Sequence, residues 1–513
     1  MLNTLNRVYK CTIRLKSTWK QPEGIETGIK IYNCITKDKV PLIISKNKPY
    51  LTWYTCGPTV YDSAHIGHAS CYIKIDIIQR ILRDYFKFRL ITVMNITDID
   101  DKIINESKTL NRSPIEIARH YEKEYLEDLD LLKIQKPDIV VRVTDNMPVI
   151  VKFIKKLVED KYAYKAKDES YYFDVETFKE YGKLQNIERG ENSIVEKSDI
   201  KKNPMDFALW KAAKAGEPFW DNSLGPGRPG WHIECSALAG NILGDTIDIH
   251  AGGIDLRFPH HENEETQSCA YFNKDQWVNY WFHVGHLHSR GSEKMSKSLK
   301  NTISIRDMLK KSTAASFRMA CLMTHYRNHM EFSDELLQTA TRNLVTIKNF
   351  IANCTIYLKG NVNAVIDNNL LLKTLETTMI NVENGLKDDF NTPIVLKSIN
   401  NLMSTTNKML GANNTNGDPT NFLSHSVCIV AVMNYLKDLF RSFGIDVLEE
   451  TGTESIEYNE VIDLLIKFRQ DVRRLGLAEN NQNTLQMCDD VREELRKIGI
   501  YVKDYGKISS WSR

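Results

Sequence analysis

Residues 57–68 read Gly-Pro-Thr-Val-Tyr-Asp-Ser-Ala-His-Ile-Gly-His, and this stretch joins two segments of different character. Before it, residues 51–55 form an apolar run that predicts a buried strand, and after it residues 69–85 have helical periodicity. A second apolar strand is expected at 88–96. Strand, helix and strand at this spacing predict a parallel α/β unit, with the quoted stretch at its first strand-to-helix turn.

The chemistry of this turn suits an anionic ligand. Gly67 lets a nucleotide approach the backbone closely, and the start of a helix offers unpaired N–H groups. His65 and His68 lie on neighbouring positions of the first turn, where both imidazoles can donate to phosphate oxygens. Taken alone, two nearby histidines are equally consistent with coincidence or with a pair of metal ligands.

A second motif, Lys-Met-Ser-Lys-Ser at residues 294–298, follows much later in the chain. Its two lysines, Lys294 and Lys297, lie in a loop flanked by glycine and serine, which predicts a mobile pair of cations. Such a pair can stabilise charge on a transferring phosphoryl group. The alternative is a solvated basic loop, because Lys300 continues the positive charge.

The rest of the chain divides into an α/β part and a helical part. Helical periodicity covers 114–132 and 148–160, and residues 163–229 are less regular and resemble an insertion between two halves of one sheet. Alternation resumes with an expected helix at 231–243, strand at 246–250, helix at 260–271 and strand at 280–286. After about residue 307 the pattern is almost wholly helical to residue 500.

Composition limits the classes of protein that fit. A chain of 513 residues with 42% hydrophobic and 26% charged residues can bury a large core in several domains. It contains no run of 18 apolar residues, which argues against a membrane span. The ten cysteines are irregularly spaced without a Cys-x-x-Cys pair, so a reducing compartment is expected rather than a disulfide framework.

The first 22 residues are basic and contain no acidic residue before Glu23. On a helical wheel, Leu2 and Leu5 share an apolar face opposite Arg7 and Lys10. This composition is typical of a mitochondrial transit peptide, and the alternative is an ordinary basic tail.

Four further side chains have the chemistry of zinc ligands. Cys56 directly precedes the first motif, and Cys235 lies in a Trp-His-Ile-Glu-Cys-Ser segment. His260 and Glu264 share a helix face at positions i and i+4, and Pro259 suits the first position of that helix. Two thiolates, an imidazole and a carboxylate suit Zn²⁺, but their wide separation in sequence, taken alone, favours ordinary core residues.

The pair His-Ile-Gly-His and Lys-Met-Ser-Lys-Ser resembles the signature of class I aminoacyl-tRNA synthetases. This resemblance implies an α/β fold: a Rossmann-like catalytic domain split by an insertion, followed by an all-helical C-terminal anticodon-binding region. It also implies that His65 and His68 contact the phosphates of ATP, and that Lys294 and Lys297 stabilise the transition state.

Within that class, residues 54–62, 95–104, 231–236 and 258–264 are similar to cysteinyl-tRNA synthetases. Further likeness lies at 388–393, and one departure is Lys300, where a glycine is usual. The resemblance implies L-cysteine, ATP with Mg²⁺, and tRNA(Cys) as substrates, a bound zinc ion, and a mitochondrial matrix location. The implied residues are Cys56, Cys235, His260 and Glu264 for zinc, Gly57, Thr97 and Trp231 for cysteine, and His65, Gly67, His68, Gly253, Asp255 and Lys297 for ATP.

The implied domain order has six parts. These are a leader at 1–27, catalytic halves at 28–150 and 230–306, an insertion at 151–229, a helical bundle at 307–450 and an anticodon-binding region at 451–513. Two other functions remain open: a cysteine-activating ligase that acts on an amino-sugar, and a catalytically dead RNA-binding relative. The long helical region argues against the first, and the intact motifs argue against the second.

Overall fold

The computed structural model describes residues 19–185, 200–289, 302–360, 364–411, 422–448, 458–505 and 508–512. The chain divides into two compact units, Met1–Leu448 and Glu449–Arg513, and each is described by itself. The leader predicted from the sequence lies mostly outside the described residues.

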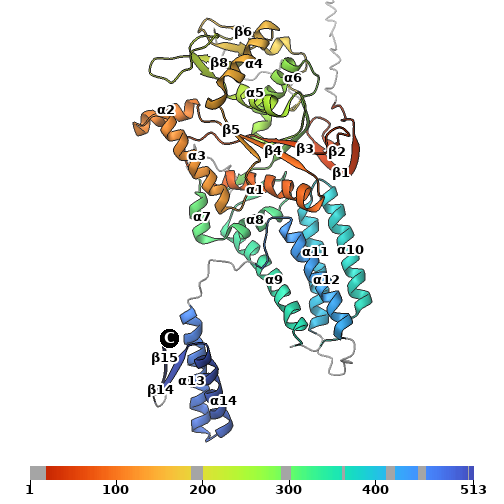
Figure 1. The fold of residues 1–513 in the computed structure, drawn as a ribbon, viewed down its shortest axis with the longest axis vertical. Helices are drawn as coiled ribbons and strands as arrows, with labels where there is room; N and C mark the ends of the chain where they lie inside the picture. Colours follow the sequence, from red (N-terminus) through yellow and green to blue (C-terminus); the bar gives the residue numbers. More distant parts are fainter. Residues whose placement is uncertain are drawn as a thin grey trace, which may run out of the picture. The chain divides into compact units, whose positions relative to one another are not determined.

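The first unit is built on a five-stranded parallel sheet with the order β11-β10-β3-β4-β5 (Figure 1). Its strands are β3 (Leu51–Thr55), β4 (Leu90–Ile96), β5 (Ile139–Arg142), β10 (Ile247–Gly253) and β11 (Val278–Val284). The four strands expected from the apolar runs are all present, with small shifts at their ends. The parallel α/β class is therefore confirmed.

The order of the strands creates a crevice at one edge of the sheet. From β3 the chain proceeds outward to β4 and β5, and it then returns to place β10 on the opposite side of β3. At such a reversal the loops that leave neighbouring strands turn in opposite directions, and ligands of open α/β sheets bind there. The loop after β3 begins at Cys56, and β10 ends at Gly253.

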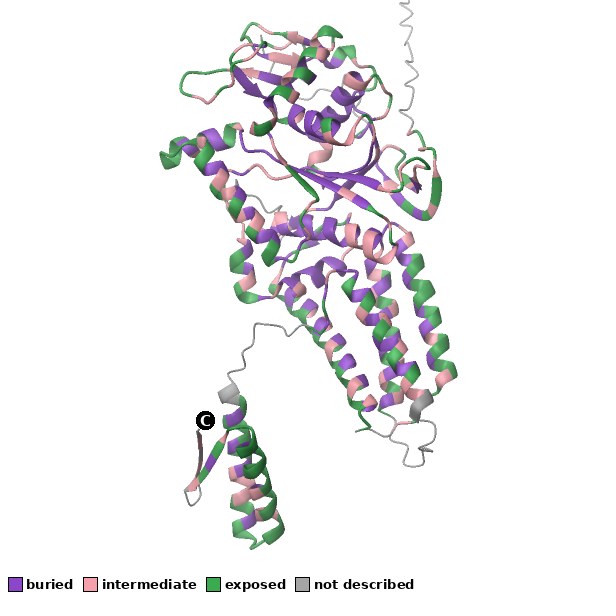
Figure 2. Cartoon of the chain, viewed as in Figure 1, coloured by how far each residue is buried: buried purple, intermediate pink, exposed green. Residues whose placement is uncertain are grey.

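Helices cover both faces of the sheet (Figure 1). Helix α1 (Ile66–Arg80) lies on one face, and α4 (Met147–Glu159), α5 (Trp231–Leu243) and α6 (Glu262–Phe272) lie on the other. The strands are consequently buried on both sides (Figure 2), as apolar runs without alternation indicate. Helix α6 starts two residues later than expected, because residues 257–261 form a separate π-helical turn in which Phe258 has extended backbone angles.

The insertion contains regular structure that the sequence pattern did not indicate. Strands β6 (Ala163–Lys165), β7 (Tyr171–Phe173), β8 (Phe207–Ala212) and β9 (Gly227–Pro229) form an antiparallel sheet. Phe173, Leu209 and Trp210 of this sheet are buried in a hydrophobic cluster. Strands of three residues are too short to give a readable alternation.

Four further elements belong to the α/β part of this unit. An antiparallel pair, β1 (Ile25–Asn33) and β2 (Asp38–Ile44), precedes the sheet. Between β4 and β5 lie α2 (Asp101–Leu110) and α3 (Pro114–Leu131). Proline at the first position of α3 and a Ser113–Glu116 capping box fix the start of that helix.

A helical region follows the sheet. It comprises α7 (Ile305–Lys311), α8 (Ala314–Leu322), α9 (Asp334–Leu358), α10 (Asn368–Lys387), α11 (Thr392–Leu410) and α12 (Phe422–Arg441). A buried ion pair ties it to the sheet: the guanidinium of Arg318 on α8 lies 2.5 Å from the carboxylate of Asp76 on α1. The same arginine also donates to the carbonyl of Phe443.

The second unit consists of α13 (Tyr458–Ala478) and α14 (Gln482–Lys497), followed by a hairpin of β14 (Tyr501–Tyr505) and β15 (Ile508–Ser512). Buried Arg469 joins these parts, because it donates to Asp504 at 2.8 Å and to the carbonyl of Cys488 at 2.8 Å. The hairpin begins at residue 501, directly after the helical pattern of the sequence ends.

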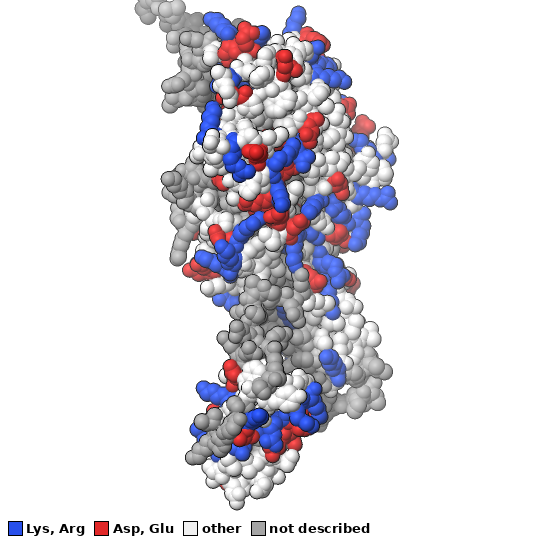
Figure 3. Space-filling model, turned by 60° about the vertical axis from the view of Figure 1, so that its left-hand side comes forward, with Lys and Arg blue, Asp and Glu red and all other residues white. Residues whose placement is uncertain are grey.

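Charge is mixed on the surface. Figure 3 shows lysine and arginine interspersed with aspartate and glutamate on the face it presents, in keeping with a net charge of +2. Among the described residues, none of the helices has the length and apolar character that a membrane crossing requires.

Candidate active site

A cavity of about 470 Å³ lies at the carboxyl edge of the central sheet. Segments that follow β3, β4, β10 and β11 line it, together with the start of α1 and the start of α5. All the described residues that the sequence nominated, except Glu264, line this cavity. They are Cys56, Gly57, His65, Gly67, His68, Thr97, Trp231, Cys235, Gly253, Asp255 and His260.

The four nominated metal ligands meet in one buried cluster. Cys56 Sγ lies 3.7 Å from Cys235 Sγ and 3.5 Å from Glu264 Oε1. The distance from Cys235 Sγ to His260 Nε2 is 3.5 Å, and His260 Nε2 lies 2.9 Å from Glu264 Oε1. These side chains come from the end of β3, from α5, from the turn before α6 and from α6 itself.

The spacing of these atoms fits a tetrahedral ion. Around tetrahedral zinc, two sulfur ligands lie about 3.8 Å apart, and a sulfur lies about 3.6 Å from a nitrogen. Only the nitrogen of His260 and the oxygen of Glu264 are closer than the roughly 3.3 Å that such an ion requires. Those two atoms face each other as an ion pair, and an opening of a few tenths of an ångström would admit a metal.

The cluster stabilises anionic donors. The hydrogen bond from Cys56 lowers the pKa of Cys235 to about 6, while burial raises the pKa of Cys56 well above its ordinary value. Although burial opposes its ionisation, His250 and His260 hold the pKa of Glu264 well below the usual range. Burial also opposes protonation of His260, but Glu264 and Cys235 raise the pKa of His260 to about 10. A thiolate and a carboxylate are the forms in which these groups bind metals.

A second layer of side chains orients the donors. His250 Nε2 lies 2.8 Å from Glu264 Oε2, and His232 Nδ1 lies 3.0 Å from His260 Nδ1. The indole of Trp231 stacks on the ring of His260, with centroids 4.1 Å apart. Since such contacts fix ring orientation and basicity, they are expected around a metal ligand.

The same pocket holds an alternative set of donors. Cys56, His250, His261 and Glu264 also lie within coordinating distance of one another, so Cys56 and Glu264 belong to both sets. His261 Nε2 lies 3.5 Å from Cys56 Sγ, while its Nδ1 lies 3.0 Å from His283 Nε2. This second set contains one thiol, whereas the first contains two. Because soft metal ions prefer thiolate ligands, we expect the second set to bind them more weakly than the first.

The two histidines of the first motif lie at the start of α1. His65 caps the helix, because its Nδ1 accepts a hydrogen bond from the backbone N–H of Gly67 at 3.0 Å. His68 Nδ1 accepts from the N–H of His65, and the two rings stack 3.9 Å apart. A methyl group on Gly67 would lie 2.7 Å from the His65 ring, so glycine is required for this arrangement.

Two other glycines allow close packing at the cavity wall. A Cβ on Gly57 would lie 1.6 Å from the carbonyl oxygen of Asn95, whose side chain accepts from the N–H of Gly57. A Cβ on Gly253 would lie 2.6 Å from the carboxylate of Asp255. Both positions therefore have a structural reason for glycine in addition to any contact with a ligand.

Sequence reasoning did not nominate two polar residues of this site. Asn95 holds the loop at Gly57, and buried Glu234 accepts a hydrogen bond from the hydroxyl of Thr97 at 2.9 Å. Burial raises the pKa of Glu234 well above its ordinary value. Each lies in or beside a quoted motif, but only the structure reveals its partner. Lys294 and Lys297 lie outside the described residues.

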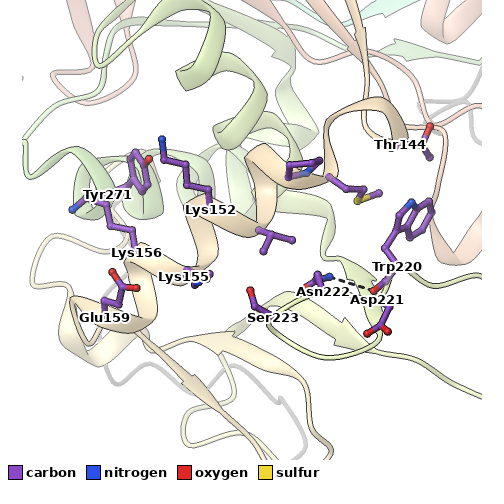
Figure 4. Close-up of a pocket in the computed structure, with 13 residues that line it drawn as sticks. Thr144, Lys152, Lys155, Lys156, Glu159, Trp220, Asp221, Asn222, Ser223 and Tyr271 are labelled. Carbon is purple, nitrogen blue, oxygen red and sulfur yellow. Dashed lines mark hydrogen bonds between the residues drawn. The ribbon is translucent and has the colours of Figure 1, made fainter.

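A larger cavity, of about 830 Å³, lies elsewhere in this unit, between α4 and the loop before β9 (Figure 4). Lys152, Lys155 and Lys156 line one side of it, and Trp220 lines another. Its lining contains neither cysteine nor histidine. We therefore take the smaller cavity as the candidate active site, because cysteine and histidine side chains line it and do not line the larger one.

Comparison with known proteins assigns the family. Residues 43–342 match the catalytic domain of class I (C) tRNA synthetases. The chain is 39% identical over 525 residues to a probable mitochondrial cysteine–tRNA ligase of Xenopus tropicalis, covering 96% of this chain and 91% of the relative. The chain belongs to the cysteine–tRNA ligase family. A cytoplasmic cysteine–tRNA ligase of Dictyostelium discoideum is 37% identical, covering 95% of this chain and 78% of that relative.

Solved structures agree on the fold of this cysteine–tRNA ligase family member. The methionyl-tRNA synthetase of Mycobacterium tuberculosis, in complex with methionyl-adenylate, matches with a TM-score of 0.61. The match covers 77% of this chain and 92% of that structure at 16% identity. At this identity the likeness establishes the class I fold alone, which confirms the expected architecture.

Proposed function

We propose that the chain activates L-cysteine with ATP and transfers the cysteinyl group to the 3′ end of tRNA(Cys). The observation that supports this most is the four-donor cluster, because three of its members line the same cavity as His65 and His68. A cavity with a sulfur-binding inner end and a phosphate-binding outer end suits the joining of cysteine to ATP. The relatives' names support the same activity.

The inner end is proposed to select cysteine through a zinc ion held by Cys56, Cys235, His260 and Glu264. Zinc bound there would take the substrate sulfur as a thiolate, a form for which a serine hydroxyl is a poor substitute. Catalytic zinc usually keeps three protein ligands and one open position. Glu264 is the donor that does not line the cavity, and it also forms an ion pair with His250. We therefore propose that Glu264 is the weakest of the four ligands.

Three residues are proposed to hold the rest of the amino acid. Gly57, Thr97 and Trp231 line the cavity beside the donors. The Thr97 hydroxyl donates to Glu234, so its lone pairs remain available to the substrate ammonium group. Trp231 covers His260 and leaves 38% of its own surface exposed, enough to contact a small substrate.

The outer end is proposed to bind ATP with Mg²⁺. His65 and His68 accept from the backbone through Nδ1, so in each neutral ring Nε2 carries the proton and is the nitrogen that can donate to phosphate oxygens. Gly67 permits close approach, and Gly253 and Asp255 are proposed to contact the ribose. The lysines Lys294 and Lys297 are proposed to stabilise the transition state.

The proposed reaction has two steps. The cysteine carboxylate attacks the α-phosphate of ATP, which forms cysteinyl-adenylate and releases pyrophosphate. A ribose hydroxyl at the tRNA 3′ end then attacks the cysteinyl carbonyl and displaces AMP. The residues contribute mainly by positioning reactants and stabilising charge.

The remaining domains are proposed to serve the tRNA. Residues 28–150 and 230–306 form the catalytic halves around the insertion at 151–229, and 307–450 forms the helical bundle. Residues 451–513 are proposed to bind the anticodon. An amino-sugar acceptor would need no such region, which is why tRNA is the acceptor we propose.

Amino-acid-dependent exchange between ATP and pyrophosphate tests this function. We expect cysteine alone among the twenty amino acids to support rapid exchange, with serine slower by at least about a thousandfold. An ordinary hydrogen-bonding pocket would separate the two by only about 1–3 kcal/mol. Equal exchange with another amino acid would refute the substrate, and a failure to charge tRNA despite rapid exchange would favour a different acceptor.

We also propose that the protein acts in the mitochondrial matrix, on the basis of the basic leader and of the mitochondrial relative. A fusion of residues 1–30 to a fluorescent reporter should enter mitochondria. Changing Arg7, Lys10 and Arg14 together to glutamate should abolish import, because import depends on a positively charged amphipathic segment. A diffuse cytosolic signal from the unchanged fusion would contradict the proposal.

A further inference from the structure

A short parallel ladder lies at the rim of the active-site cavity. Strand β12 (Leu287–His288) follows β11, and it pairs with β13 (Met330–Glu331) in the register Leu287↔Met330. Leu287 and Met330 are both almost completely buried, at 3% and 2% exposure. Side chains alternate along a strand, so the residues on either side of this buried pair point to the opposite, outer face.

That outer face carries three histidines. His286 and His288 flank Leu287, and His329 precedes Met330 on the neighbouring strand. Backbone hydrogen bonds from Met330 to His286 and from Phe332 to His288 hold the two segments together. The pairing of the two segments thus brings all three histidines to one side of the ladder.

The three imidazoles converge. One ring nitrogen from each lies within 4.8 Å of the other two, and the ring centroids of His288 and His329 are 4.6 Å apart. This cluster is distinct from the buried one, since it shares no residue with Cys56, Cys235, His260 or Glu264. Unlike that cluster it is open to solvent, because His286 and His288 are half-buried and His329 is exposed.

A second observation comes from His286. Its Nε2 lies 3.0 Å from Asp255 Oδ1, so the carboxylate of Asp255 pairs with this ring. A carboxylate beside the ring of a coordinating histidine is a frequent feature of metal sites, where it fixes the ring and raises its basicity. The pairing of Asp255 with the His286 ring fits this pattern.

We propose that His286, His288 and His329 form a second metal site, which binds a divalent transition ion such as Zn²⁺ or Ni²⁺ and leaves a position for water. Imidazole nitrogen suits zinc, copper and nickel, whereas magnesium and calcium require oxygen donors. Three histidines with an open position are an established donor set for zinc. The site rests on the geometry of the ladder and does not depend on the proposed aminoacylation activity.

Nickel titration of the full, untagged chain tests this site. One equivalent of zinc per chain is first added to fill the buried cluster, the zinc content is measured, and Ni²⁺ binding is then followed by calorimetry. The parent should bind one Ni²⁺ per chain, and His329→Ala should weaken that binding at least about tenfold without changing the zinc content. His120→Ala, which removes an exposed histidine of α3, is the matched control and should bind as the parent does.

A second variant and a measurement of stability distinguish the loss of a metal ligand from misfolding. His288→Gln removes another ligand with a side chain that retains hydrogen bonding, and it should weaken Ni²⁺ binding to a similar extent. Thermal unfolding of both variants should match that of the parent. The proposal is overturned if the parent binds no Ni²⁺ beyond the zinc site, or if folded His329→Ala and His288→Gln both bind it as tightly as the parent.

Discussion

At the inner end of the active-site cavity, His260 is 1% exposed and contacts Cys235, Glu264, His232 and Trp231. At the outer end, His65 and His68 are half-buried. Their rings stack on each other, each accepts from the backbone of the α1 start, and His65 also pairs with Ser304 as an isolated bridge. The same residue type is thus enclosed among potential metal ligands at one end and lies half-buried at a helix start at the other.

This difference corresponds to what each end is proposed to bind. A metal ion and a substrate thiol differ only slightly in radius and softness from the ions and molecules that compete with them. Their site must therefore hold its side chains rigidly and exclude water. A triphosphate carries charge over many oxygens and must enter and leave in each cycle, so donors at an accessible helix start suffice. Removing one contact should therefore cost more at the inner end.

The largest effect is expected from Cys235→Ser. Replacing a thiolate that lies 3.7 Å from Cys56 and 3.5 Å from His260 should abolish tight zinc binding. Cysteine-dependent exchange should fall at least about a thousandfold, while ATP still binds the outer end. The measurements are metal content, exchange rate and nucleotide affinity.

Cys428→Ser is the matched control, because Cys428 is a buried free cysteine of α12 far from the cavity in sequence and in fold. It should keep its zinc and its exchange rate. If Cys235→Ser retains zinc and still rejects serine, the inner end does not select cysteine through a metal.

A smaller effect is expected at the outer end from His68→Asn. The asparagine can still accept from the backbone at the helix start, as His68 Nδ1 does at 3.3 Å, but it cannot reach the phosphates in the same way. Loss of one donor to developing charge typically lowers the rate about a hundredfold. Zinc content should be unchanged, which separates the two ends of the cavity.

His120→Asn provides the control, since it makes the same replacement at an exposed position of α3. A His68→Asn enzyme whose exchange stays within about threefold of the parent would show that this histidine does not contact the phosphates.

The sequence was informative about the identity of these residues and less so about their arrangement. Motifs indicated Cys56, Cys235, His260 and Glu264 individually, but 179 positions separate the two cysteines. Their meeting depends on the return of the chain from β5 to β10, a property of the whole sheet. Local patterns report which face of an element is apolar, and they do not report which distant element packs there.

Other features had no local signal at all. The antiparallel sheet of the insertion is built from strands as short as β6 (Ala163–Lys165), which are too brief for alternation to be recognised. The histidines at 286, 288 and 329 come together only because β12 and β13 pair. The first motif, by contrast, was located from the sequence because its strand, turn and helix are contiguous.

The smallest effect is expected from Trp231→Phe, which changes the ring that covers the inner end of the cavity but replaces none of the four proposed zinc ligands. The indole stacks on His260 at 4.1 Å and an angle of 24° between the rings, and a phenyl ring can preserve part of that contact. Aromatic pairs of this kind contribute about 0.5–1.5 kcal/mol, so the KM for cysteine should rise about threefold to tenfold with little change in kcat. Trp220→Phe, in the larger cavity that lacks cysteine and histidine, should leave both constants unchanged. A fall in kcat with an unchanged KM would instead mean that Trp231 acts in the transition state rather than in binding the amino acid.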